Sequence, residues 1–122
     1  MNMKILPMSK ENAYVPTSFH NDRIYASANE ISKKFGVEID SFGDEKTNFE
    51  FALELEDGTP FYLYDWKEGS WVTEDTKLYY HIGANNALDS HKVCRELGRY
   101  FQTRNASDME SDIARLMMML GR

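Results

Sequence analysis

The chain has 122 residues, a net charge of -6 and a pI of about 5.0. This length suits one domain, residues 1–122, and an apolar content of 42% excludes a disordered chain. No run approaches the ~20 apolar residues of a membrane-spanning helix, and the first residues are too polar for a signal peptide. We therefore expect a cytoplasmic protein that has no membrane partner.

The first segment, residues 1–23, looks irregular, since it contains Pro7, Pro16 and the turn-prone letters HNDR. A short helix is predicted after it, over residues 27–36. Ser27 and Glu30 have the spacing of a capping box, in which each side chain binds the backbone N–H of the other residue. Gly36 is typical of the left-handed residue that ends a helix.

The acidic residues are concentrated in one window. Residues 38–57 contain eight acids against one base, Lys46, which gives this window a net charge of -7. Such a window repels nucleic acid and attracts basic partners. The residues expected to contact a basic protein partner are Glu50, Glu54, Glu56 and Asp57. The alternative is a solvated face that only keeps the protein in solution.

A sheet is predicted in the middle of the chain. Apolar and polar residues alternate over residues 49–56, which is the period of a half-buried strand. Gly58 supplies a turn, residues 61–66 form the return strand, and residues 77–83 form a third. We predict an α+β fold: a three-stranded antiparallel β-meander with 61–66 in the middle, a short N-terminal helix and two C-terminal helices.

The letters YDWK place Asp65 and Lys67 on the face opposite Trp66. One interpretation is a cross-strand ion pair. The other is an aromatic anchor for a partner protein, and then Trp66 and Trp71 belong to the binding residues. Tyrosine- and tryptophan-rich sheet faces also stack nucleic acid bases, but the neighbouring acids argue against a nucleic acid partner.

The segment YYHIGANN, Tyr79 to Asn86, joins the last predicted strand to the next helix. A turn at Gly83–Asn85 followed by a helix start could hold an anion, with His81 as a general base. This gives one alternative function, a small nucleotide- or anion-binding enzyme at His81–Gly83. The preferred interpretation is a structural joint in which Asn86 caps the helix.

No other pattern indicates catalysis. The three histidines lack metal-binding spacing, and no phosphate loop or nucleophile elbow is present. Cys94 lies on the apolar side of the predicted helix and suits the core. We expect no catalytic residue, metal site or cofactor.

Two helices are predicted to close the chain. The first starts at Asn86, continues through residue 105 and contains Gly98, where a close contact is expected. The second starts at Ser107 and packs on the domain through Ile113 and Leu116. The methionines expected to pair with a second copy in a homodimer are Met117, Met118 and Met119. In the alternative, a monomer, Ile5, Leu6 and Met8 of the N-terminal segment cover these methionines.

The letters YDWKEG followed by YYHIGANNALDSHKVCREL resemble small proteins of tailed phages and bacterial mobile elements. Their pattern has D-W-K at one strand end and then an aromatic residue with H-I-G at the next. The resemblance covers about residues 49–101, and Tyr80 stands where the pattern has tryptophan. It implies a non-enzymatic accessory protein in the cytoplasm of a bacterial host cell, which binds and modulates or inhibits a host or bacterial-defence protein.

Overall fold

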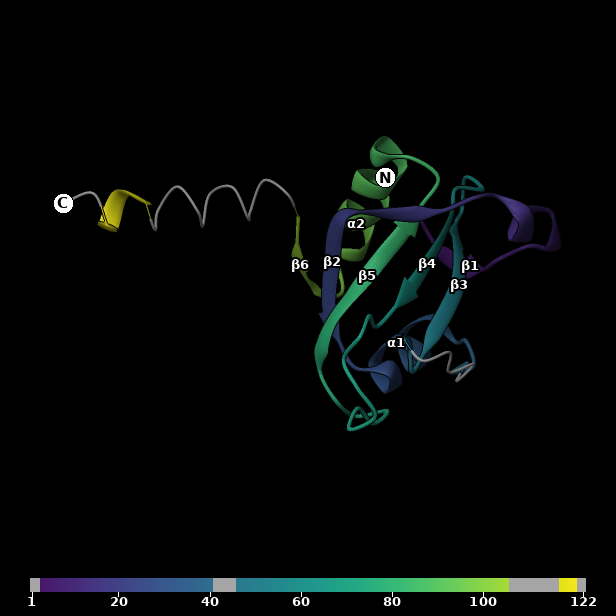
Figure 1. Ribbon diagram of the computed structural model, residues 1–122. Coiled ribbons are helices and arrows are strands. Elements are labelled where there is room, and N and C mark those ends of the chain that lie inside the picture. The colour runs from purple at the N-terminus through teal and green to yellow at the C-terminus, as the bar shows by residue number, and fades with distance from the viewer. Residues whose placement is uncertain (1–2, 41–45, 106–116, 121–122) are drawn as a thin grey trace.

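A computed structural model describes residues 3–40, 46–105 and 117–120 of the chain. Six antiparallel strands form one sheet in the order β1-β3-β4-β5-β2-β6 (Figure 1). The strands are β1 (Ile5–Pro7), β2 (Ser18–Ala26), β3 (Glu50–Leu55), β4 (Pro60–Tyr64), β5 (Leu78–Ala84) and β6 (Gln102–Arg104). The described helices are the 3₁₀ helix η1 (Lys10–Tyr14), α1 (Ala28–Phe35) and α2 (Ala87–Leu97).

The α+β class is confirmed, and β3, β4 and β5 are the predicted meander with β4 in the middle. The prediction of only three strands was wrong, because residues 1–23, expected to be irregular, contain β1, η1 and most of β2. The alternation along β2 is hidden in the sequence by a shift of register between Phe19 and Arg23, where Asn21 has a φ of 71°. A bulge of this kind interrupts the period of two that identifies a strand.

Helix α1 forms as predicted. The Ser27 side chain accepts a hydrogen bond from the backbone N–H of Glu30, and Glu30 Oε1 accepts one from Ser27 N, both at 3.1 Å. Gly36 ends the helix in the left-handed conformation, with a φ of 64°. Ile31, on the inner side of this helix, is fully buried.

Helix α2 begins as predicted, since the Asn86 side chain accepts from Asp89 N at 2.8 Å. The predicted continuation to residue 105 was wrong: the helix ends at Leu97, and β6 then pairs with β2. Gly98 lies at this reversal. A Cβ there would lie 3.4 Å from the carbonyl oxygens of Cys94 and Arg95 and 3.5 Å from Thr103 Cγ2, which are ordinary contact distances, so the close contact expected at Gly98 is not found.

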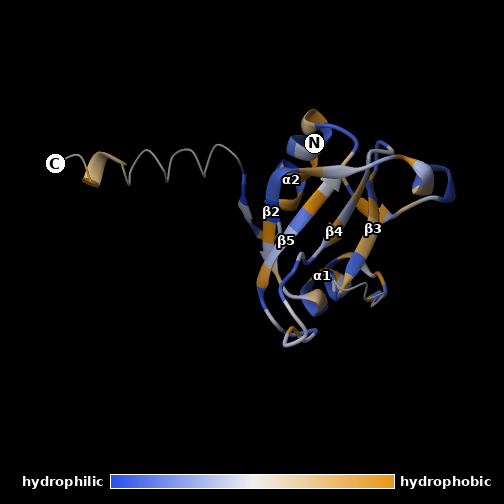
Figure 2. Ribbon diagram, in the orientation of Figure 1, coloured by the Kyte–Doolittle hydropathy of each residue, from blue (hydrophilic) through white to orange (hydrophobic). Residues whose placement is uncertain are grey.

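Both α-helices pack on the same face of the sheet, and α2 lies behind β2 and β5 in Figure 1. The colours along the strands in Figure 2 show hydrophobic residues between hydrophilic ones. The largest fully buried side chains form the core between the sheet and the helices: Tyr80, Phe61, Ile24, Ile31, Leu53, Leu55, Leu63, Ile82, Leu97 and Val93. Neither α1 nor α2 covers the other face, which we call the open face, and the segment of η1 contacts it through Glu54.

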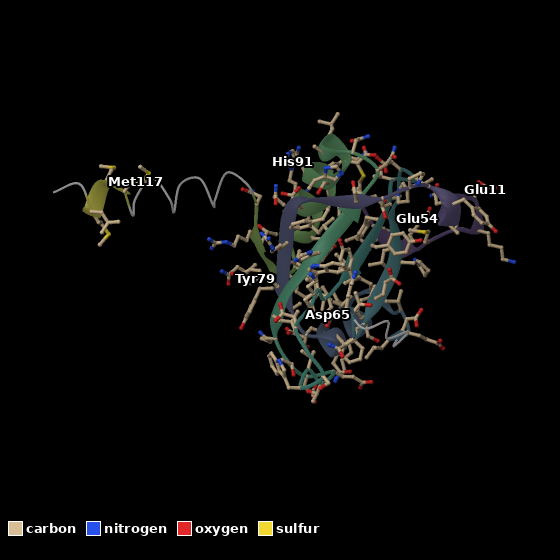
Figure 3. All side chains as sticks on the ribbon, in the orientation of Figure 1. Glu11, Glu54, Asp65, Tyr79, His91 and Met117 are labelled. Atoms are coloured by element: carbon tan, nitrogen blue, oxygen red, sulfur yellow. The ribbon has the colours of Figure 1, made fainter. Side chains whose placement is uncertain are left out.

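The predicted C-terminal helix falls mostly outside the described residues, including Ser107, Ile113 and Leu116. Residues 117–120 are helical, and Met117, Met118 and Met119 are exposed. Met117 lies away from the sheet (Figure 3). The N-terminal segment does not cover these methionines, because β1 pairs with β3 and Ile5 is buried in the core.

None of the helices in the described ranges has both the length and the apolar character needed to cross a membrane.

Candidate binding surface

The open face of the sheet is rich in aromatic side chains from three neighbouring strands. Residues that alternate with the buried ones point to this side, and the register brings them together: Tyr64 of β4 lies opposite His81 of β5. His81 in turn lies opposite Arg23 of β2, and Tyr79 lies opposite Tyr25. Adjacent strands therefore place ring beside ring on a surface that neither α1 nor α2 covers.

Four rings form a continuous line, which we call the aromatic row: Phe19, His81, Tyr64 and Trp66. Phe19 and His81 stack with centroids 4.0 Å apart and planes at 17°. Tyr64 meets His81 edge-on at 5.4 Å and Trp66 edge-on at 6.1 Å. Ring pairs in these arrangements contribute about 0.5–1.5 kcal/mol beyond the area that they bury. The aromatic row is therefore a preformed surface.

His81 is uncharged in this row at neutral pH. Burial lowers its pKa to about 4, and the positive charge of Arg23 acts in the same direction. Arg23 also lies over the Phe19 ring, 4.7 Å from its centroid. A histidine with so low a pKa is a weak general base at pH 7. Its contacts are those of an aromatic packing residue.

The turn predicted at Gly83–Asn85 lies further along the chain. Strand β5 continues to Ala84, and Gly83 is paired with Tyr62 and Phe19 on its two sides. A Cβ on Gly83 would meet Tyr64 Cε1 at 3.3 Å. A Cβ here would press on the Tyr64 ring, because the aromatic row packs closely over the strand. The turn before α2 lies at Asn85–Asn86, after His81–Gly83.

A hollow of about 500 Å³ lies at the β4 side of the aromatic row. Trp66 forms part of its wall and is 38% exposed. The side chains of Lys46 and Lys67 lie over the Trp66 ring, each with Nζ 5.6 Å from the centroid. The residues lining the hollow are Val15, Thr17, Ser18, Thr47, Glu50, Tyr62, Tyr64, Trp66 and Gly83. Polar groups make up most of the lining, beside the rings of Tyr62, Tyr64 and Trp66, and this mixture suits a bound side chain.

Asp65 forms hydrogen bonds in place of the cross-strand ion pair that was one interpretation of this segment. Asp65 is fully buried and accepts three hydrogen bonds from the segment before β3. The donors are Asn48 N and Phe49 N, both at 2.8 Å, and Asn48 Nδ2 at 2.7 Å. Asp65 thus fixes the entry to β3 and holds Trp66, the next residue, at the end of β4.

The predicted acidic residues are divided between two roles. Glu50 lines the hollow. Glu54 accepts hydrogen bonds from Ser9 N and from Asn12 Nδ2, the latter at 3.2 Å, so it holds the N-terminal segment on β3 (Figure 3). The Ser9 N–H is the main cause that lowers the pKa of Glu54.

Glu56 and Asp57 also bind groups of the protein itself. Glu56 Oε1 accepts from Lys4 N at 3.0 Å. The Thr59 hydroxyl and then Lys92 lower the pKa of Asp57 to about 2, and Lys92 Nζ lies 2.9 Å from Asp57 Oδ2. Of the four acids predicted to bind a partner, Glu50 is thus the one placed at the hollow.

Trp71 lies in the segment between β4 and β5 and is 64% exposed. It does not line the hollow that Trp66 forms. Sequence reasoning missed Phe19 and Arg23, because both belong to the segment that was expected to be irregular. The alternation of Arg23, Ile24, Tyr25 and Ala26 after the bulge is the signal that could have found them.

Among the described residues, no group of three or more His, Cys, Asp or Glu side chains could hold a metal ion. Comparisons of the chain with protein-family models, with curated proteins and with solved structures found no match.

Proposed function

We propose that the protein is a non-enzymatic binding protein whose recognition surface is the hollow beside the aromatic row. One observation carries this proposal: α1 and α2 pack on one face of the sheet, and the other face carries a line of contacting rings that ends at Trp66, which is 38% exposed. Exposed aromatic surfaces on small proteins usually mark interfaces, and tryptophan and tyrosine dominate the residues that contribute most to binding.

The partner in this proposal is a protein that presents a basic or apolar side chain to the hollow. Glu50 supplies negative charge there. The chain as a whole carries a net charge of -6, which speeds encounter with a basic surface. The same charge repels a nucleic acid backbone, although Lys46, Lys67 and Arg23 lie on the aromatic row.

The resemblance of YDWKEG and YYHIGANN to phage proteins supports a function inside an infected bacterial cell. In this proposal the protein is an accessory factor in the cytoplasm of a bacterial host cell. It binds a host or bacterial-defence protein and modulates or inhibits it by occupying a surface that the target needs.

Affinity capture from bacterial lysate, with and without infection, tests the proposal. Capture by the wild-type protein is compared with capture by a double variant, Trp66→Ala with Tyr62→Ala. These two changes remove the wall of the hollow. The matched control is Leu88→Ala, because Leu88 is an exposed apolar residue on α2, on the other side of the sheet. We expect the double variant to lose the captured protein and the control to retain it, with capture weakening as salt rises.

A captured protein that binds the double variant as well as the wild type would contradict the proposed surface. Capture of nucleic acid instead of protein would contradict the proposed partner class.

A further inference from the structure

A second cleft lies on the helix side of the sheet, between α2 and the paired strands β2 and β6. Its volume is about 540 Å³, within the range of small-molecule sites. The lining residues are Asp22, His91, Cys94, Arg95, Gly98, Arg99, Thr103 and Asn105. The cleft thus has a carboxylate at β2 and two guanidinium groups on or just beyond α2.

Asp22 is the unusual residue of this cleft, because it is 0% exposed and its hydrogen bonding is incomplete. Its Oδ2 accepts from Ser90 Oγ at 2.6 Å and lies 2.8 Å from His91 Nδ1. Its Oδ1 has no hydrogen-bond partner among the described residues. A buried carboxylate oxygen without a donor is costly, so the site lacks one donor.

The position of Asp22 is fixed by the bulge of β2 on one side and by contact with α2 on the other. The backbone of β2 bulges between Phe19 and Arg23, and this places Asp22 on the helix side of the sheet. Since a carboxylate only accepts hydrogen bonds, the His91 nitrogen that faces Asp22 carries a proton. The imidazole is held by Asp22 and yet is 51% exposed, which places it at the rim of the cleft.

A positive charge, opposite to that of Asp22, lies on α2 one helical turn after His91. Arg95 is four residues after His91 on α2, which corresponds to about 6 Å along the helix axis. Arg95 is exposed and lines the cleft. Arg99 also lines it, with Nε donating to Glu96 Oε2 at 3.0 Å. The cleft therefore offers an acceptor at its base and cationic donors at its rim.

We propose that this cleft binds a small ligand with an ammonium group at one end and a phosphate at the other. The ammonium donates to Asp22 Oδ1 and balances the buried carboxylate. The phosphate lies on Arg95, where guanidinium geometry matches its oxygens. A short phosphorylated amine carries both of these groups. The site is on the opposite side of the sheet from the aromatic row, so neither proposal depends on the other.

Backbone NMR titration with O-phosphoethanolamine tests the site. We expect saturable shifts of the amide signals of Asp22, His91 and Gly98, with a dissociation constant of about 1 mM or lower. Ethanolamine and inorganic phosphate each carry half of the recognised chemistry. We expect each of them to bind at least tenfold more weakly than the whole probe.

Two variants separate the two ends of the cleft. In Asp22→Asn, the amide oxygen can still accept from Ser90 and His91, while the amide NH₂ replaces the orphan oxygen and rejects an ammonium group. Arg95→Gln removes the cation from an exposed position. Each variant is expected to weaken binding of the probe at least tenfold, and Lys10→Gln, on η1, is the control that leaves it unchanged.

Thermal unfolding measures whether Asp22→Asn is folded. If Asp22→Asn does not fold, Arg95→Gln still tests the site, because Arg95 is exposed. If the probe causes no saturable shift with the wild-type protein, the proposal is overturned. Equal binding by wild type and Arg95→Gln also overturns it. If wild type and a folded Asp22→Asn bind the probe equally, the proposal is also overturned. The donor to Asp22 Oδ1 is then water and not the ligand.

Discussion

At the scale of single residues, two buried carboxylates of the sheet have opposite surroundings. Asp65 accepts three hydrogen bonds from Asn48 and Phe49, whereas Asp22 keeps one oxygen without a donor. The sequence predicted the direction of Asp65 correctly, because alternation along the strand places it opposite Trp66. It could not predict the partner, because the donors come from a loop 16 or 17 residues away.

We predict that Asp65→Ala destabilises the protein by about 3 kcal/mol, because it leaves buried backbone N–H groups of the Asn48–Phe49 segment without an acceptor. Urea unfolding measures the change. Asp75→Ala is the control: it removes an exposed acceptor of Asn29 Nδ2, and a change within about 0.5 kcal/mol is expected. Equal effects of the two variants would contradict the role assigned to Asp65.

A second prediction at this scale concerns pH. The pKa of His81 is about 4 in the folded protein and near its ordinary value of 6.5 in the unfolded chain. The unfolded state therefore binds more protons between these values, and the free energy of unfolding falls as pH drops from 6.5 to 4. The loss is on the order of 1–2 kcal/mol, after allowance for the partial exposure of the ring.

His81→Phe keeps a ring on Phe19 and removes the titrating group. We expect this variant to lose that part of the pH dependence, measured as the difference from wild type in urea unfolding at pH 7 and pH 4. Identical pH profiles of the two proteins would mean that His81 is protonated as readily in the folded state as in the unfolded chain.

At the scale of elements, local signals predicted the starts of helices better than they predicted strands. The capping box at Ser27 and Glu30 and the cap at Asn86 are short-range patterns, and both were confirmed. Strand β2 was missed because its bulge breaks the alternation, and β6 because its three residues are defined by pairing with β2. The aromatic row was predicted only in part, since Phe19 belongs to β2.

Glu54 of β3 is one of the residues that hold β1 and η1 on the sheet. Glu54 accepts from Ser9 N and Asn12 Nδ2, and β1 adds three paired residues along β3. We predict that Glu54→Ala costs about 1–2 kcal/mol and raises hydrogen exchange at residues 5–12 first. Glu68→Ala, in the segment after β4, is the control. Unchanged exchange at residues 5–12 in Glu54→Ala would contradict this tether.

At the scale of the whole molecule, the exposed methionines remain the clearest unmatched surface. Met117, Met118 and Met119 are each at least 66% exposed, and Ile5 and Leu6, which the monomer interpretation placed over them, belong to β1 instead. We propose that they pair with a second copy of the chain in a two-fold dimer. Methionine suits such a contact because its side chain adapts to the opposing surface.

Light scattering at micromolar concentration is expected to give twice the chain mass of 14.2 kDa. Met118→Lys combined with Met119→Lys should return the mass to that of one chain. Leu88→Lys, another exposed apolar position, should not. A single-chain mass for the wild type, unchanged in the double variant, would exclude the dimer.

The pairing of β2 with β5 also determines the order in which the chain can fold. Strands β3, β4 and β5 are joined by hairpins and can form from nearby residues, but β2 ends at Ala26 and its partner β5 starts at Leu78. Closing so long a loop is slow, because its entropy is lost before the contacts form. During synthesis β2 must therefore wait until β5 has left the ribosome, and its nine residues are open to chaperones or to wrong partners meanwhile.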